Sequence, residues 1–134
     1  VMSPIVAGWV RTPFHRAHKG KLANMRPESM VASCIVQIVS RLNINSEDID
    51  DVIVGCAYPE GEQGYNIGRM AALLSKLPET VPGMTINRLC GSSMQAAISA
   101  ANAISVGQGE CYVVAGVESM SRVKRLASSL GRRS

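Results

Sequence analysis

The stretch Asn87-Arg88-Leu89-Cys90-Gly91-Ser92-Ser93 lies between a short apolar run and a long alanine-rich segment with helical spacing. This pattern predicts a strand, a tight turn and a helix, with the thiol of Cys90 at the helix N-terminus. The unpaired N–H groups and the dipole at that end of a helix favour a thiolate, the form that attacks a carbonyl carbon. Gly91, Ser92 and Ser93 are small, so we expect them to leave room for a substrate beside the sulfur.

Strand-like and helical patterns alternate along the rest of the chain. Four short apolar runs predict strands, and three stretches with apolar residues at helical spacing predict helices. The predicted strands are Ile5–Val10, Val52–Ala57, Met84–Leu89 and Cys111–Val117, and the predicted helices run from Pro27 to Leu42, from Ile67 to Pro78 and from just after Cys90 to Gly107. Such alternation indicates an α/β fold with one largely parallel, mixed sheet and flanking helices. In this arrangement the loops that carry chemistry follow the carboxyl ends of strands, where Cys90 falls.

Composition and charge restrict the possible functions. The 134 residues suffice for one domain, and 46% apolar content with 18% charge argues for a packed globular body. Four of the 14 Lys and Arg residues lie in residues 124–134, so residues 1–123 hold ten basic and ten acidic residues. We therefore predict one incomplete domain over residues 1–123 and a basic tail over residues 124–134, which is expected to be disordered or a truncated end. Because the surplus charge is confined to the tail, we expect no nucleic-acid binding.

The other cysteines show no pattern that carries chemistry. Cys34, Cys56 and Cys111 fall in apolar helix or strand patterns and are interpreted as structural, since no spacing suggests a disulfide framework or a metal site. No apolar run reaches the roughly 20 residues of a membrane span, and the start lacks a signal-peptide pattern. We therefore expect a cytoplasmic protein with no metal and no membrane contact. His15 and His18 lie in a stretch without periodicity and are predicted to be solvated loop residues.

Four blocks of the chain resemble the thiolases, the family of acetyl-CoA acyltransferases and acetyltransferases, in order and spacing. The blocks are Arg11–Phe14, Gly64–Arg69, Asn87–Ala96 and Ala115–Ser121. The block around Cys90 is the most specific, since the related ketoacyl synthases have Ala-Cys-Ser in place of Leu-Cys-Gly. The resemblance covers roughly residues 4 to 123 and implies the N-terminal half of a layered thiolase fold.

This resemblance implies acyl transfer between thioesters, as 3-ketoacyl-CoA thiolysis or as Claisen condensation of acetyl-CoA. Cys90 would take the acyl group as a thioester, and its backbone N–H would be one donor to the oxyanion. Gly91 and Ser92 would keep the rim of the site beside the Cys90 sulfur open for the pantetheine arm of coenzyme A. Coenzyme A and acyl-CoA would be substrates, with no bound cofactor. The family also implies a homodimer or a dimer of dimers.

The remaining groups of the family's site match nothing in this chain. The histidine that activates the cysteine, the groups that hold the thioester oxygen and the second, acid/base cysteine lie in the family's second half, and the loop domain that grips coenzyme A is unmatched. Two hypotheses stay open: the chain is a thiolase N-terminal half that works with a second half, in the same protein or on a partner, or it is a non-catalytic thiolase-fold fragment or interaction module. Because the family's second half covers the alanine-rich helix, we expect this chain alone to expose an apolar patch and to self-associate, to aggregate or to need a partner that carries the second half.

Overall fold

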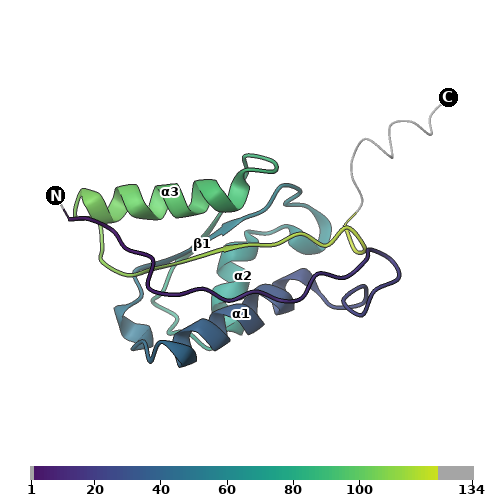
Figure 1. The fold of residues 1–134 in the computed structure, drawn as a ribbon, viewed down its shortest axis with the longest axis horizontal. Helices are drawn as coiled ribbons and strands as arrows, with labels where there is room; N and C mark the ends of the chain where they lie inside the picture. Colours follow the sequence, from purple (N-terminus) through teal and green to yellow (C-terminus); the bar gives the residue numbers. More distant parts are fainter. Residues whose placement is uncertain (1, 124–134) are drawn as a thin grey trace.

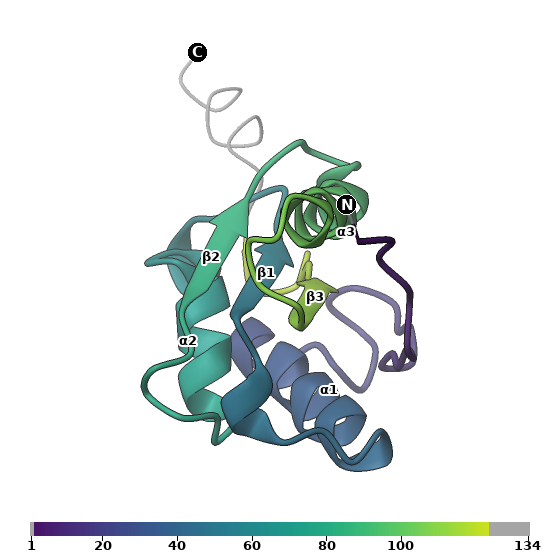
Figure 2. The same ribbon diagram turned by 90° about the vertical axis from the view of Figure 1, so that its left-hand side faces the viewer.

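The computed structural model describes residues 2–123, so the predicted tail at 124–134 lies outside the described residues. In chain order, the elements are α1 (Pro27–Arg41), the 3-10 turn η1 (Ser46–Asp48), β1 (Asp51–Gly55), the 3-10 turn η2 (Gly61–Gln63), α2 (Ile67–Leu74), β2 (Gly83–Ile86), α3 (Ser92–Ser105) and β3 (Tyr112–Gly116). The strands form one parallel sheet in the order β2-β1-β3. Helices α1 and α2 cover one face and α3 covers the other (Figure 1, Figure 2). The predicted α/β fold with a parallel sheet and flanking helices is confirmed.

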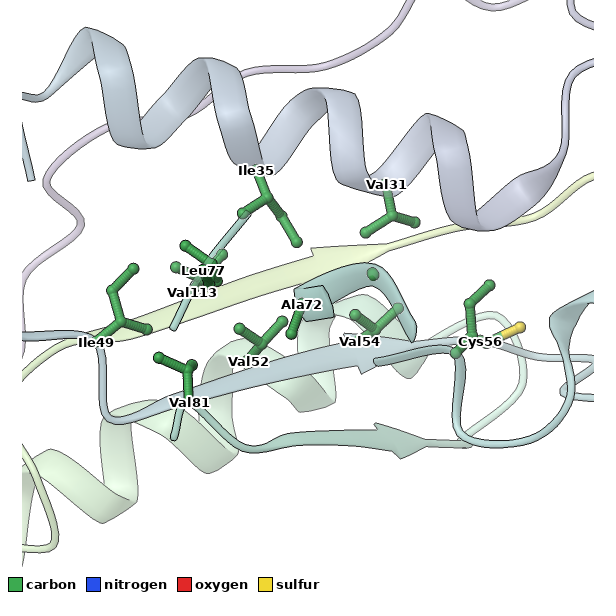
Figure 3. Packing of buried hydrophobic residues seen from close by; sticks show 12 residues of the cluster. Val31, Ile35, Ile49, Val52, Val54, Cys56, Ala72, Leu77, Val81 and Val113 are labelled. Atoms are coloured by element: carbon green, nitrogen blue, oxygen red, sulfur yellow. The ribbon is translucent and has the colours of Figure 1, made fainter. Parts of the chain in front are cut away.

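The central strand β1 is buried on both faces, which explains its nearly continuous apolar sequence. Val52 and Val54 belong to the core beneath α1 and α2 (Figure 3). Ile53 points the opposite way, as strand alternation requires, and packs against Ala96 and Ala100 of α3. The small side chains of α3 therefore let that helix lie close to the sheet.

Helix α1 begins where the sequence predicts, with Pro27 at its first turn. Proline suits that position because the first-turn N–H groups have no partner within the helix. Val31 and Ile35, one turn apart, point from α1 toward the sheet (Figure 3). The amphipathic pattern thus identified both the helix and its buried face.

The predicted strand at Ile5–Val10 is wrong. This segment is not in the sheet, and among the described residues no backbone hydrogen bond involves it. The side chains of Ile5 and Val6 are 84% and 87% exposed. Gly8 lies against Leu42, just beyond α1, so the segment packs beside the helix instead of pairing with β3. An apolar run indicates a tendency to be buried, but a strand also needs a neighbour in register, which this segment lacks.

Two predicted elements end three or four residues earlier than expected. Strand β2 ends at Ile86, not Leu89, because residues 87–91 form a turn held by its own side chains. Helix α2 ends at Leu74, before the predicted limit at Pro78. The early end of β2 places residues 87–91, with Cys90 among them, in the connection between strand and helix.

Candidate functional site

The turn between β2 and α3 is held by side chains of the motif itself. The Asn87 Oδ1 atom accepts a hydrogen bond from the Leu89 N–H at 2.9 Å. The Ser92 hydroxyl accepts one from the Arg88 N–H at 2.9 Å and donates one to the Leu89 carbonyl oxygen at 2.6 Å. Leu89 has φ +47°, in the left-handed region that residues with a side chain seldom adopt. Together with backbone bonds from the Gly91 N–H to Arg88 and from the Ser92 N–H to Leu89, these three bonds define the path of the chain from strand to helix.

Cys90 lies in this turn and is exposed to solvent. It directly precedes Gly91, the N-cap residue of the 14-residue helix α3. Among residues 2–123, no acceptor takes the backbone N–H of Cys90. An exposed sulfur and an unpaired N–H therefore stand together at the start of a helix, where negative charge is stabilised.

Gly91 and Ser92, both predicted to line the rim, occupy different environments. Gly91 is partly exposed, and a Cβ added there would meet nothing nearer than the Arg88 carbonyl oxygen at 3.5 Å. Neither the packing of this chain nor a positive φ therefore demands glycine at that position. Ser92 is only 4% exposed, and its hydroxyl is fully engaged within the turn. Only Gly91 of this pair faces open space.

A pair of glycines beneath the first turn of α3 positions the site. Gly55 and Gly116 end β1 and β3 and are direct neighbours in the sheet register. A Cβ on Gly55 would lie 2.3 Å from the backbone carbonyl carbon of Ser92, and one on Gly116 would lie 2.6 Å from the Ser93 Cβ. The helix therefore rests directly on the carboxyl ends of two strands. The sequence contains one signal for this platform, which our predictions did not use: each of two apolar runs has a glycine near its end.

The other three cysteines are at least partly buried. Cys56 is fully buried, while Cys34 and Cys111 are partly buried. Burial, followed by the nearby charge of Glu118, raises the pKa of the Cys56 thiol to about 11. Burial also raises the pKa of the Cys111 thiol. Cys90 is thus the exposed cysteine of the four, and the others are placed as structural residues would be.

A buried glutamine joins the loops that follow β1 and β3. The amide nitrogen of Gln63 donates to the Tyr58 carbonyl oxygen at 2.9 Å, and its amide oxygen accepts from the Ser119 N–H at 2.7 Å. Glu118 adds a further link by accepting from the Ala57 N–H. This set of contacts, the Gln63 clasp, holds together the two loops at the carboxyl edge of the sheet. The sequence does not reveal the Gln63 clasp, because a single glutamine in a loop carries no local signal.

His15 and His18 are exposed in the loop before α1, as predicted. The backbone N–H of His18 donates to the Ser121 hydroxyl at 2.8 Å, which ties this loop to the segment after β3. Within residues 2–123, no histidine ring is hydrogen-bonded to Cys90. In the same part of the chain, no group of three His, Cys, Asp or Glu side chains could hold a metal ion. None of the helices described there has the length and apolar character to cross a membrane.

Comparisons with known proteins agree with this architecture. The family described as "Thiolase, N-terminal domain" matches residues 4–134. The 3-ketoacyl-CoA thiolase of Colwellia psychrerythraea is 44% identical over 89% of this chain and 31% of its own length. The beta-ketoadipyl-CoA thiolase of Acinetobacter baylyi is 47% identical over 84% of this chain and 28% of its own length.

A solved structure shows the same relationship. The crystal structure of the Bacillus anthracis acetyl-CoA acetyltransferase matches with a TM-score of 0.78 and 38% identity, covering 84% of this chain and 28% of that chain. The chain spans about 30% of the length of the curated relatives that it matches. The fold, the turn motif and these comparisons lead to one assignment: the chain belongs to the thiolase family and matches its N-terminal domain.

Proposed function

We propose that this chain supplies the acyl-accepting cysteine of an acyl transfer between thioesters, either 3-ketoacyl-CoA thiolysis or acetyl-CoA condensation. Membership of the thiolase family supports this class of reaction. The observation that carries the proposal is the position of Cys90, the exposed cysteine at the start of α3. Coenzyme A and acyl-CoA would be the substrates.

The geometry suits covalent catalysis. In thiolysis, the Cys90 thiolate adds to the 3-keto carbon and forms a carbon–sulfur bond, and the bond between the 2- and 3-carbons breaks. Acetyl-CoA leaves after its carbanion takes up a proton, and the thiolate of coenzyme A then removes the acyl group from Cys90. The unpaired N–H of Cys90 would donate to the oxyanion. Losing such a donor typically costs about 3 kcal/mol in the transition state.

Gly91 would leave space for the pantetheine arm beside the sulfur. The support is that neither a positive φ nor a close contact within this chain requires glycine there. Gly91→Ala should therefore leave the chain folded and hinder the approach of an acyl-CoA to Cys90. Equal acetylation of Cys90 in Gly91→Ala and in the parent chain would remove Gly91 from the proposed site.

A second candidate is a non-catalytic thiolase-fold fragment or interaction module. It is favoured by the lack of any histidine hydrogen-bonded to Cys90 among the described residues. Without such a base, only the helix start remains to stabilise negative charge on the sulfur. The first candidate then requires the second half of the site, in the same protein or on a partner, and the family suggests a homodimer or a dimer of dimers. The cysteine spacing, which suggests no disulfide framework, favours the cytoplasm.

Thiol labelling distinguishes the candidates. The chain is treated with iodoacetamide at neutral pH, and the labelled peptides are followed by mass spectrometry. An activated Cys90 labels faster than Cys34, whereas equal rates mean that Cys90 is not activated in this chain. In a second arm, acetyl-CoA replaces iodoacetamide and Cys90→Ser is the control. An acetyl group on Cys90 supports catalysis. A chain that stays unmodified both alone and together with the second half of the site supports the non-catalytic candidate.

A further inference from the structure

We propose that Asn87 and Ser92 are positioning residues, which hold Leu89 in its left-handed conformation and thereby place Cys90 at the start of α3. The inference rests on the proposed function, in which Cys90 accepts the acyl group. It gives Ser92 a role in shaping the turn in place of the expected role at the substrate rim.

The backbone of Leu89 is unfavourable and needs support. A left-handed conformation brings the Cβ of an L-residue close to the following carbonyl oxygen. Packing of the side chain does not provide that support, because Leu89 is 61% exposed. Such conformations persist only where the surrounding structure determines them. The support must therefore come from hydrogen bonds to the backbone around Leu89.

The side chains of Asn87 and Ser92 provide such bonds on both sides of Leu89, and the Ser92 N–H adds a backbone bond to the Leu89 carbonyl oxygen at 3.1 Å. Asn87 accepts the Leu89 N–H at 2.9 Å, and the Ser92 hydroxyl donates to the Leu89 carbonyl oxygen at 2.6 Å. The same hydroxyl accepts the Arg88 N–H at 2.9 Å, so Ser92 restrains two successive peptide groups. Ser92 is itself held in place, because it is buried and its backbone packs against Gly55.

The position of Cys90 depends on this arrangement. Cys90 follows Leu89 directly, so the rotation at Leu89 decides where the sulfur and the Cys90 N–H lie relative to α3. The Gly91 N–H closes the turn by donating to the Arg88 carbonyl oxygen at 3.0 Å. If Leu89 relaxed to a negative φ, Cys90 would stay exposed but would leave the helix N-terminus, and with it the N–H groups that stabilise negative charge there.

Amide hydrogen exchange at single-residue resolution tests the inference, because each variant leaves one reporter bond intact. In Ser92→Ala, the Leu89 N–H keeps its acceptor on Asn87, so loss of its protection reports a change of conformation. In Asn87→Ala, the Arg88 N–H keeps its acceptor on Ser92 and reports in the same way. We expect each reporter amide to lose protection about tenfold, as when one hydrogen bond stops supporting a left-handed residue.

The control is Ser93→Ala, since Ser93 is exposed and its hydroxyl has no hydrogen bond among the described residues. It should leave both reporter amides unchanged, and the β1 amides should stay protected in every variant, which shows that the fold survives. Asn87 is exposed, so its replacement does not disturb the core. Leu89→Gly in the Ser92→Ala background should restore protection at residue 89, because glycine adopts a positive φ without strain.

The rate of Cys90 alkylation at neutral pH provides the functional readout. It should fall in Ser92→Ala and in Asn87→Ala and recover with Leu89→Gly. Unchanged reporter amides together with an unchanged alkylation rate would overturn the positioning role, even if Cys90 is reactive. A parent chain in which Cys90 reacts no faster than Cys34 would count against the proposed function, while the exchange data would still decide how the turn is held.

Discussion

Replacing Gly55 by alanine should displace the first turn of α3 and weaken the fold. The new methyl carbon would lie 2.3 Å from the carbonyl carbon of Ser92 and 2.4 Å from the nitrogen of Ser93. Both are backbone atoms, so no side-chain rotation can relieve the contact. Overpacking typically costs about 1–3 kcal/mol, and we expect the upper end of that range here. With a urea dependence of about 2 kcal/mol per molar, the unfolding midpoint should fall by about 1.5 M.

Urea unfolding of dilute protein, followed by far-ultraviolet circular dichroism, measures this effect. Gly91→Ala is the matched control, because the nearest atom to its new Cβ is 3.5 Å away. The control should lower the free energy of unfolding by less than about 1 kcal/mol, the usual effect of alanine at an N-cap. Equal midpoints for Gly55→Ala and the parent chain would refute the direct contact between β1 and α3.

Three further results are expected. Gln63→Leu should lower the free energy of unfolding by about 2–3 kcal/mol in urea titrations, because it leaves the buried Ser119 N–H without an acceptor; a midpoint equal to that of the parent chain would contradict the clasp. Because burial raises the pKa of Cys56 from 9.0 to about 11, the unfolded chain releases its thiol proton at lower pH than the folded chain. Stability should therefore fall between about pH 9 and 11, and Cys56→Ala should flatten that decline; an equal slope in both would show that Cys56 does not contribute. The chain should self-associate in light scattering, since Met94 and Val106 are 65% and 78% exposed, and lysine at both positions should reduce the association; a compact monomer at every concentration would contradict this.

Local sequence patterns were sufficient to predict the helices and strands whose buried face follows from their own apolar periodicity. The apolar spacing after Pro27 identified α1 and its buried face, and the apolar run at Val52–Ala57 identified the strand β1. The segment Ile5–Val10 has an equally apolar sequence, yet it pairs with no strand in the described structure. Hydrophobicity reports that a segment favours burial, whereas pairing depends on which other segments come near it.

The sequence by itself determined the α/β class, the strand–turn–helix position of Cys90 and the resemblance to the thiolases, because these depend on residues close together along the chain. Only the tertiary structure decided what surrounds that cysteine. Gly55 is a platform because α3 packs on it, and Gln63 is a clasp because it reaches Ser119, 56 residues further on. Ser92 turns inward to the Leu89 carbonyl oxygen, although its small size suggested an open rim. Such roles arise from contacts that the folded backbone creates, and the identity of a residue does not specify them.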